Sequence, residues 1–182
     1  MKPRMNKIML SIRPEWVKRI LDGKKTIEVR KTCPWSKMAE PIKCYIYETK
    51  GLLKSEDGRY HTGRGRGAVV AEFVCSTIDE YVIVGGMQGD REYMRRSGGR
   101  AIPIDLERLQ MSRKDLNEYG AGARLYGLHI SGLTKYDTPR DVQEFLRRRL
   151  IKKPGVTIEA WQQMEKPPIS WGYVEEGGGA IG

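Results

Sequence analysis

The sequence is poor in the residues from which metal and redox sites are built. Its 182 residues include three cysteines, Cys33, Cys44 and Cys75, and two histidines, His61 and His129. No Cys-x-x-Cys pair occurs, and the five residues lack the spacing of a structural zinc site, which needs about four ligands. We therefore expect no bound metal, and we expect reduced thiols in a cytoplasmic protein.

Long apolar runs and cofactor fingerprints are also missing. No segment approaches the roughly 18 to 20 apolar residues that span a bilayer, and the basic N-terminal residues are not followed by the apolar stretch of a secretory signal. Neither the phosphate-cradling Gly-x-x-x-x-Gly-Lys-Ser/Thr pattern nor a strand-linked dinucleotide fingerprint is present. The sequence thus predicts no membrane partner and no organic cofactor.

Positive charge, by contrast, is in excess. The chain has 33 Lys and Arg residues against 23 Asp and Glu residues, a formal net charge of +10. The basic residues gather in a glycine-rich loop at 63–67, around a second one at 95–100, and at 147–153. Clustered cations release the counterions condensed on a polyanion, which favours a nucleic-acid partner. The alternative is a basic surface that only confers solubility.

Hydrophobic periodicity predicts several short strands and three short helices. The expected strands cover residues 6–12, 26–31, 42–48, 68–75, 125–131 and 169–174, and the expected helices cover residues 14–22, 106–118 and 137–150. We interpret 51–67 as a mobile loop and 85–104 as an irregular insertion, because both are rich in glycine and charge. Residues 177–182 are expected to form a frayed tail.

These elements predict one α+β domain over residues 1–176, with loop insertions near 50–67 and 83–105. A hydrophobic content of 39% is sufficient for a folded core. No helix of crossover length follows each strand, so a doubly wound parallel sheet is disfavoured. A small, mostly antiparallel β-barrel with short flanking helices fits the pattern better. The oligomeric state is left open.

The segment from Gly23 to Arg30 carries the strongest functional signal. In a strand, Thr26, Glu28 and Arg30 share one face, while alternate residues pack on the other. Lys25 adds a second cation beside them. Such a polar face suits a cleft that recognises a phosphate, a sugar or a base edge, with Arg30 as a planar clamp. The alternative is a surface ion pair between Glu28 and Arg30, which is worth little.

Three aromatic residues and one histidine are further candidates for this cleft. Tyr45, Tyr126 and Trp171 could stack a splayed base, although ordinary packing is the commoner role of such side chains. His129 lies in the middle of a predicted strand, between Leu128 and Ile130. It points opposite to these neighbours, either into the cleft or into a structural hydrogen bond.

Three segments taken in order resemble ASCH domains of the PUA-like superfamily. Residues 10–31, LSIRPEWVKRILDGKKTIEVRK, resemble the opening strand and helix of these domains, and residues 125–140, LYGLHISGLTKYDTPR, are similar to their late strand. Residues 167–174, PPISWGYV, are similar to the closing strand of the phage and prophage branch. The resemblance implies a PUA-like β-barrel that binds RNA or modified nucleobases beside the Lys-x-x-Glu-x-Arg strand.

The resemblance also leaves an enzyme open. Some ASCH proteins are similar to N4-acetylcytidine amidohydrolases, in which a Lys, a Thr and a Glu are proposed as catalytic. Lys25 matches the Lys, but Glu28 occupies the place of the Thr, and Thr26 lies two positions off. Other ASCH proteins are reported to cut RNA, for which Lys25 and Glu28 could form an acid–base pair. We expect a module for single-stranded RNA or a modified nucleotide, with an RNA-processing enzyme as the alternative.

Overall fold

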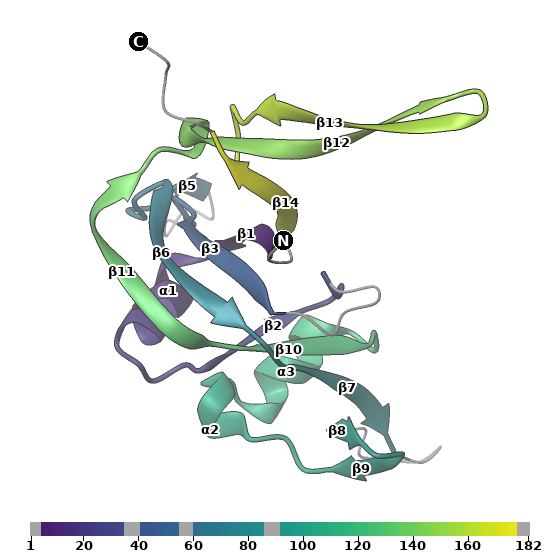
Figure 1. Ribbon diagram of the computed structural model, residues 1–182. Coiled ribbons are helices and arrows are strands. Elements are labelled where there is room, and N and C mark those ends of the chain that lie inside the picture. The colour runs from purple at the N-terminus through teal and green to yellow at the C-terminus, as the bar shows by residue number, and fades with distance from the viewer. Residues whose placement is uncertain (1–4, 35–40, 55–59, 86–91, 178–182) are drawn as a thin grey trace.

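The computed structural model describes residues 5–34, 41–54, 60–85 and 92–177 (Figure 1). Of the tail predicted at 177–182, residues 178–182 lie outside this part. The described chain is rich in β-structure, arranged as a seven-stranded sheet, a five-stranded sheet and a small two-stranded sheet. In the residues that the structure describes, no helix is long and apolar enough to cross a membrane.

The seven-stranded sheet is built around the first strand. β1 (Asn6–Ile12) pairs in parallel with β3 (Ile42–Glu48) and antiparallel with β14 (Trp171–Glu176). The order across the sheet is β11-β6-β3-β1-β14-β12-β13. Its remaining strands are β6 (Ala68–Cys75), β11 (Ser131–Arg140), β12 (Phe145–Lys153) and β13 (Val156–Gln163).

The five-stranded sheet has the order β2-β10-β7-β8-β9 and is antiparallel in every pair. Its strands are β2 (Ile27–Arg30), β10 (Leu125–His129), β7 (Ile78–Val84), β8 (Glu92–Ser97) and β9 (Arg100–Ile102). The chain passes directly from β6 to β7 and from β10 to β11, and these segments are paired in both sheets. The two sheets are therefore tied together by a shared, bent antiparallel pair (Figure 1). β4 (Leu52–Lys54) and β5 (Tyr60–Thr62) form the small sheet.

Three short α-helices cover the sheets. α1 (Pro14–Leu21) begins with proline at its first turn, where the missing N–H costs nothing. α3 (Arg113–Gly120) is capped by Ser112, whose hydroxyl and backbone N–H form a reciprocal capping box with Asp115. α2 (Leu106–Leu109) precedes it, and η1 (Val142–Glu144) is a single 3-10 turn after β11.

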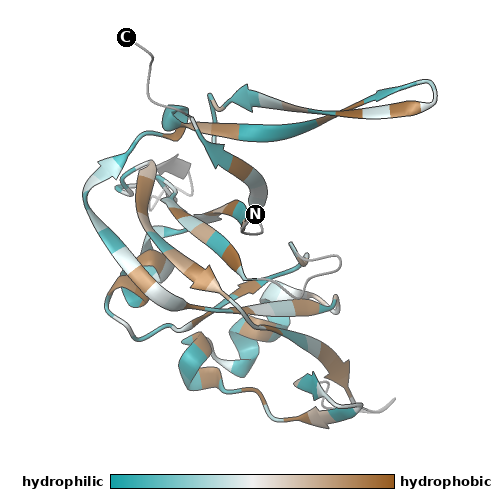
Figure 2. Ribbon diagram, viewed as in Figure 1, coloured by the Kyte–Doolittle hydropathy of each residue, from teal (hydrophilic) through white to brown (hydrophobic). Residues whose placement is uncertain are grey.

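The apolar side chains form three clusters, on both faces of the seven-stranded sheet and beneath α2 and α3. The first contains Ile8, Leu10, Cys44 and Ile46 together with Val17 and Ile20 of α1. The second lies on the other face of β1 and β3 and contains Met9, Tyr45, Tyr47 and Phe145. The third packs Leu109 and Leu116 of α2 and α3 against Ile27, Val29 and Tyr81. In Figure 2 the hydrophobic colour runs along most of β6, whereas β3 shows hydrophobic and hydrophilic bands in turn.

The prediction of a mostly antiparallel β-fold with short helices is confirmed. The helix expected at 14–22 and the strands expected at 6–12, 42–48 and 68–75 lie within a residue of their observed bounds. The strand orders of the two larger sheets are open at both ends. Closure into a barrel and the PUA-like assignment therefore stay predictions, as does the single-domain boundary at 176.

The helix expected at 137–150 is wrong. Those residues form the end of β11, the turn η1 and most of β12. Val142, Phe145 and Leu150 have helical spacing, but Leu150 is 57% exposed while Phe145 is fully buried, so they form no single apolar stripe. Pairing of β12 with β13 and β14 overrides the local pattern.

Two segments expected to be irregular also contain strands. The antiparallel β8 and β9 lie within 85–104, joined at a turn where Gly98 and Gly99 both have positive φ. Within 51–67, β4 and β5 pair, and Gly63, Gly65 and Gly67 donate backbone hydrogen bonds to residues 48–51. Residues 55–59 and 86–91 of these segments lie outside the described part. β7 and β13 were not predicted.

Candidate functional site

Three charged side chains from the Gly23–Arg30 segment form one buried group, here called the charged triad: Lys25, Glu28 and Arg30. The carboxylate of Glu28 lies between the two cations, with Oε2 3.6 Å from Lys25 Nζ and Oε1 3.0 Å from Arg30 Nη2. The three residues are 2%, 6% and 7% exposed. Glu28 and Arg30 are therefore not a surface ion pair but part of a desolvated charge cluster.

The turn after α1 places Lys25 in this cluster. Gly23 adopts a positive φ of 72°, and the backbone N–H groups of Lys24 and Lys25 both donate to Arg19 O. Lys25 Nζ then donates to Leu109 O of α2 at 2.7 Å and lies 5.1 Å from the ring centre of Trp16. Burial lowers the pKa of Lys25, and the Glu28 carboxylate opposes that shift only in part.

Arg30 is held by the first strand but keeps one donor unused. Its Nη2 donates to Ser11 O at 3.1 Å, beyond the contact with Glu28. Its Nε–H is buried and has no hydrogen-bond partner among the residues that the structure describes. A buried donor without a partner costs free energy, so this N–H is a group that a bound acceptor would satisfy.

Two of the predicted aromatic residues lie on the same side as Arg30. Tyr126 is the direct cross-strand partner of Arg30 in the β2–β10 ladder. Trp171 Nε1 donates to Thr32 Oγ1 at 2.8 Å, two residues beyond Arg30, and its ring packs edge-on against Tyr173. Both Tyr126 and Trp171 are partly exposed and pack against the first apolar cluster.

Tyr45 and His129 are not brought to this group. Tyr45 is fully buried in the second apolar cluster, with its ring edge-on to Phe145 at 4.9 Å. It faces away from the first cluster because alternate residues of β3 point to opposite faces. His129 pairs with Ile27 of β2, so it shares the face of Ile27 and lies opposite Glu28.

On that opposite face, His129 belongs to a second polar chain. Its Nε2 lies 2.8 Å from Asp79 Oδ2, and Asp79 also pairs with Arg95 at 3.2 Å. Arg108 Nη2 lies 3.4 Å from His129 Nδ1, and Arg108 Nε donates to Thr26 Oγ1 at 3.0 Å. The prediction that Thr26 shares a face with Glu28 and Arg30 is therefore wrong, because Thr26 precedes β2 and its hydroxyl joins this second polar chain.

The ionisation of Asp79 reflects these contacts. Burial alone would raise the pKa of the Asp79 carboxyl, but the hydrogen bonds and charges of His129 and Arg95 lower it below its usual value. Nothing in the sequence indicated that Arg108 and Asp79 lie near Thr26, because they come from α2 and β7 and reach His129 only through tertiary contacts.

Tyr119 of α3 is a neighbour of the charged triad that sequence reasoning missed. Its hydroxyl donates to Val29 O at 3.4 Å, and Lys31 Nζ lies 5.1 Å from its ring centre. Burial raises the pKa of the Tyr119 hydroxyl, and the charge of Arg30 opposes that shift. Tyr119 packs against the third apolar cluster, so it lies on the Val29 face of β2, opposite the face of Arg30.

Two hollows lined by the described residues lie away from the charged triad. One of about 250 Å³ lies between β8 and α3 and is lined by Tyr93, Ile104, Leu116 and Asn117 among others. No group of three His, Cys, Asp or Glu residues is placed to hold a metal ion within residues 5–34, 41–54, 60–85 and 92–177. The charged triad itself is buried, and its cations are paired with Glu28 and with two backbone carbonyls, Leu109 O and Ser11 O.

Comparisons with known proteins give no family assignment. No protein-family profile matches the chain, and no curated protein matches it. Among solved structures, the chain is similar to an ASCH protein from Zymomonas mobilis, with 14% identity and a TM-score of 0.47 over 93% of this chain and 87% of that one. Two mutants of the same protein give similar values. One has 17% identity and a TM-score of 0.46 and covers 76% of each chain. The other has 15% identity and a TM-score of 0.45 over 93% of this chain and 90% of that one.

Proposed function

We propose that the chain binds single-stranded RNA or a modified nucleotide beside the charged triad. The observation that carries the proposal is the state of Arg30, a guanidinium that is 7% exposed, fixed at Nη2, and left with an unpartnered Nε–H among the described residues. A planar donor held in this way suits the acceptor edge of a base or a phosphate oxygen.

The surrounding residues supply the other parts of a nucleotide site. Glu28 orients Arg30 through the 3.0 Å contact, and Lys25 adds a second positive charge behind it. Tyr126 and Trp171 are partly exposed aromatic side chains on the same side, where a splayed base could stack. Entry of a base requires a shift of these two rings, because both pack against the core.

The decisive test is calorimetric titration with cytidine, N4-acetylcytidine and a ten-nucleotide single-stranded RNA. Arg30→Lys retains the charge but loses the planar fork, and we expect at least tenfold weaker binding than in the parent protein. Arg124→Lys, at an arginine whose side chain is 54% exposed, is the matched control and should bind like the parent. Equal affinity of Arg30→Lys and the parent would exclude Arg30 from the site.

An RNA-processing enzyme is the second candidate, and one observation favours it. Burial lowers the pKa of Lys25, which brings this amine closer to the range in which it can accept a proton. Incubation with labelled RNA and with N4-acetylcytidine tests for turnover. Product formed by the parent and by Lys24→Met, whose lysine is exposed, but not by Lys25→Met, would establish catalysis; no product in any of them would leave binding alone.

A further inference from the structure

The strands β12 and β13 form a two-stranded arm, here called the basic ribbon, that projects from the rest of the molecule (Figure 1). Eight cross-strand pairs run from Leu146–Gln163 to Lys153–Val156, and the turn between the strands is Pro154–Gly155, with Gly155 at a φ of 75°. Nine residues of β12 span about 30 Å at roughly 3.4 Å per residue. From Leu150 to Glu159 every residue outside that turn is exposed, so neither face of the outer half is covered.

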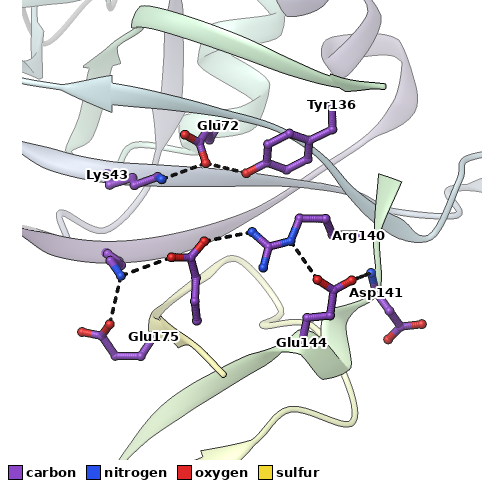
Figure 3. A network of polar contacts seen from close by, with 9 residues as sticks. Lys43, Glu72, Tyr136, Arg140, Asp141, Glu144 and Glu175 are labelled. Atoms are coloured by element: carbon purple, nitrogen blue, oxygen red, sulfur yellow. Dashed lines mark hydrogen bonds and ion pairs between the residues drawn. The ribbon is translucent and has the colours of Figure 1, made fainter. Parts of the chain in front are cut away.

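The base of the ribbon is firmly attached. Phe145 is fully buried, and the Arg140 guanidinium lies 4.5 Å from its ring centre. Arg140 also pairs with Glu144 and Glu176 at 2.9 Å each, which joins β11, η1 and β14 at this point (Figure 3). Met164 donates its backbone N–H to Phe145 O, closing the other end of β13. The base of the ribbon is therefore fixed to the sheets, and its outer half projects from them.

The ribbon is strongly basic. β12 contains five basic residues in the run FLRRRLIKK, whereas β13, VTIEAWQQ, contains one acidic residue. That residue, Glu159, lies 3.7 Å from Arg148, which also stacks over Tyr173 at 3.8 Å. Arg149, Lys152 and Lys153 are exposed and form no ion pair with the residues that the structure describes.

Apolar side chains lie among these cations. Ile151 and Ile158 face each other across the ribbon and are 45% and 41% exposed, and Val156 at the tip is 53% exposed. In Figure 2 the ribbon shows hydrophobic bands among hydrophilic ones along its outer half. Val156 lies on the same face as the two isoleucines, whereas Leu150 and Trp161, which are 57% and 37% exposed, lie on the other face. An isolated two-stranded ribbon is marginal in water, and exposed apolar residues mark a contact surface.

We propose that the basic ribbon enters the major groove of double-stranded DNA. That groove is about 12 Å wide and admits a two-stranded β-ribbon, whereas the major groove of A-form RNA is deep and narrow. Arg149 and Lys153, which share the face of Ile151, would contact phosphates on the groove walls, and Lys152 on the other face would add to the positive charge. The isoleucines and Val156 would contact thymine methyl groups on the groove floor.

The charge of the ribbon favours DNA as its partner over a second copy of the same ribbon. Pairing of two ribbons from two copies would bring five basic residues against five, with one acid on each side, and such like-charge contacts are unfavourable. A polyanion, by contrast, gains from each cation by counterion release. The proposal is independent of the charged triad, since it uses no residue of that site.

The test measures fluorescence anisotropy with a labelled 20-base-pair DNA duplex, a matched RNA duplex and the corresponding single strand. The ribbon variant combines Arg149→Glu, Lys152→Glu and Lys153→Glu, and the control combines Lys18→Glu, Lys114→Glu and Lys135→Glu, at exposed lysines on α1, α3 and β11. Both change the net charge equally. We expect the ribbon variant to lose at least tenfold more affinity for duplex DNA than the control.

A second comparison tests the groove itself. Replacing thymine by uracil in the DNA duplex removes the methyl groups, and we expect severalfold weaker binding by the parent but no change for the triple variant Ile151→Ser/Val156→Ser/Ile158→Ser. Equal losses in the two charge variants, equal or tighter binding of the RNA duplex, or self-association through the ribbon would each overturn the proposal. Arg30→Lys should bind the DNA duplex like the parent, which separates this result from the nucleotide site.

Discussion

At the scale of single residues, burial of the charged triad costs free energy, and its contacts fix the positions of Lys25 and Arg30. Burying a charge is expensive unless it is paired and hydrogen-bonded, and Glu28 serves two cations at once. Leu109 O and Ser11 O accept further hydrogen bonds from those cations. One carboxylate thus holds two cations that would otherwise repel each other, and it aims the Arg30 guanidinium.

Neutralising that carboxylate should be costly. Glu28→Gln keeps the shape but leaves two buried cations uncompensated, so we expect a loss of about 3–5 kcal/mol in the free energy of unfolding. Glu80→Gln is the matched control, since Glu80 also pairs with two arginines, Arg96 and Arg124, but their side chains are each 54% exposed. The control should lose less than about 1 kcal/mol. Urea denaturation measures both, and similar losses would contradict the buried triad.

Asp79 should make stability depend on pH in the acid range. Its pKa is lowered in the folded protein, so the folded state binds fewer protons than the unfolded state. Its contribution is fully present above the unfolded value of about 3.9 and is lost as pH falls through the lower folded value. Asp79→Asn should therefore be less stable than the parent by a constant amount at pH 5–6, and the difference should shrink below about pH 4. A difference that persists unchanged to pH 2, measured by urea denaturation, would contradict this.

At the scale of elements, strand alternation predicted which neighbours share a face but not which strands pair. Glu28 and Arg30 lie together as expected, because their separation of two residues fixes their face within one strand. Tyr45 and His129 could not be placed in the same way. Their positions depend on the pairing of β1 with β3 and on the His129–Ile27 register, and both are set by tertiary structure.

The wrong helix at 137–150 has the same origin. A run with apolar residues at helical spacing and a proline near its start satisfies the helical pattern. The deciding information lies further along, at the Pro154–Gly155 turn and in the partner strand β13, whose exposed faces leave no strong alternation of apolar and polar residues. The basic cluster at 147–153 was detected from the sequence, but its arrangement as a projecting ribbon could not be.

Strand β10 contains a glycine, Gly127, at a position where the neighbouring strand leaves no room for a side chain. A Cβ on Gly127 would overlap the hydroxyl of Tyr81, a residue that is 1% exposed in the adjacent strand. Gly127→Ala should therefore destabilise the fold by about 1–3 kcal/mol through overpacking. Gly172→Ala in β14 is the control, because a Cβ there would make only an ordinary contact with Pro168 at 3.5 Å. Thermal unfolding distinguishes the two, and equal midpoints would contradict the close approach.

At the scale of the whole molecule, the buried apolar clusters and the exposed basic ribbon occupy different regions. The three apolar clusters lie within the two larger sheets and the helices that cover them, and Phe145 is the one residue of the described ribbon that they include. The outer half of the ribbon therefore adds charge and exposed apolar surface but little to the core. The proposed DNA contact and the nucleotide site consequently depend on separate parts of the chain.

Because of this division, we expect that the outer half of the ribbon can be deleted without unfolding the protein. Arg149 and Ala160 are cross-strand partners, so residues 150–159 can be replaced by Asn-Gly, the pair preferred in a two-residue hairpin turn. We expect the shortened protein to unfold cooperatively within about 4 °C of the parent midpoint, because no buried side chain is lost. It should retain the single-stranded RNA binding of the parent and lose duplex DNA binding. A large drop in the unfolding midpoint would show that the ribbon supports the fold, and retained duplex binding would place the DNA contact on another surface.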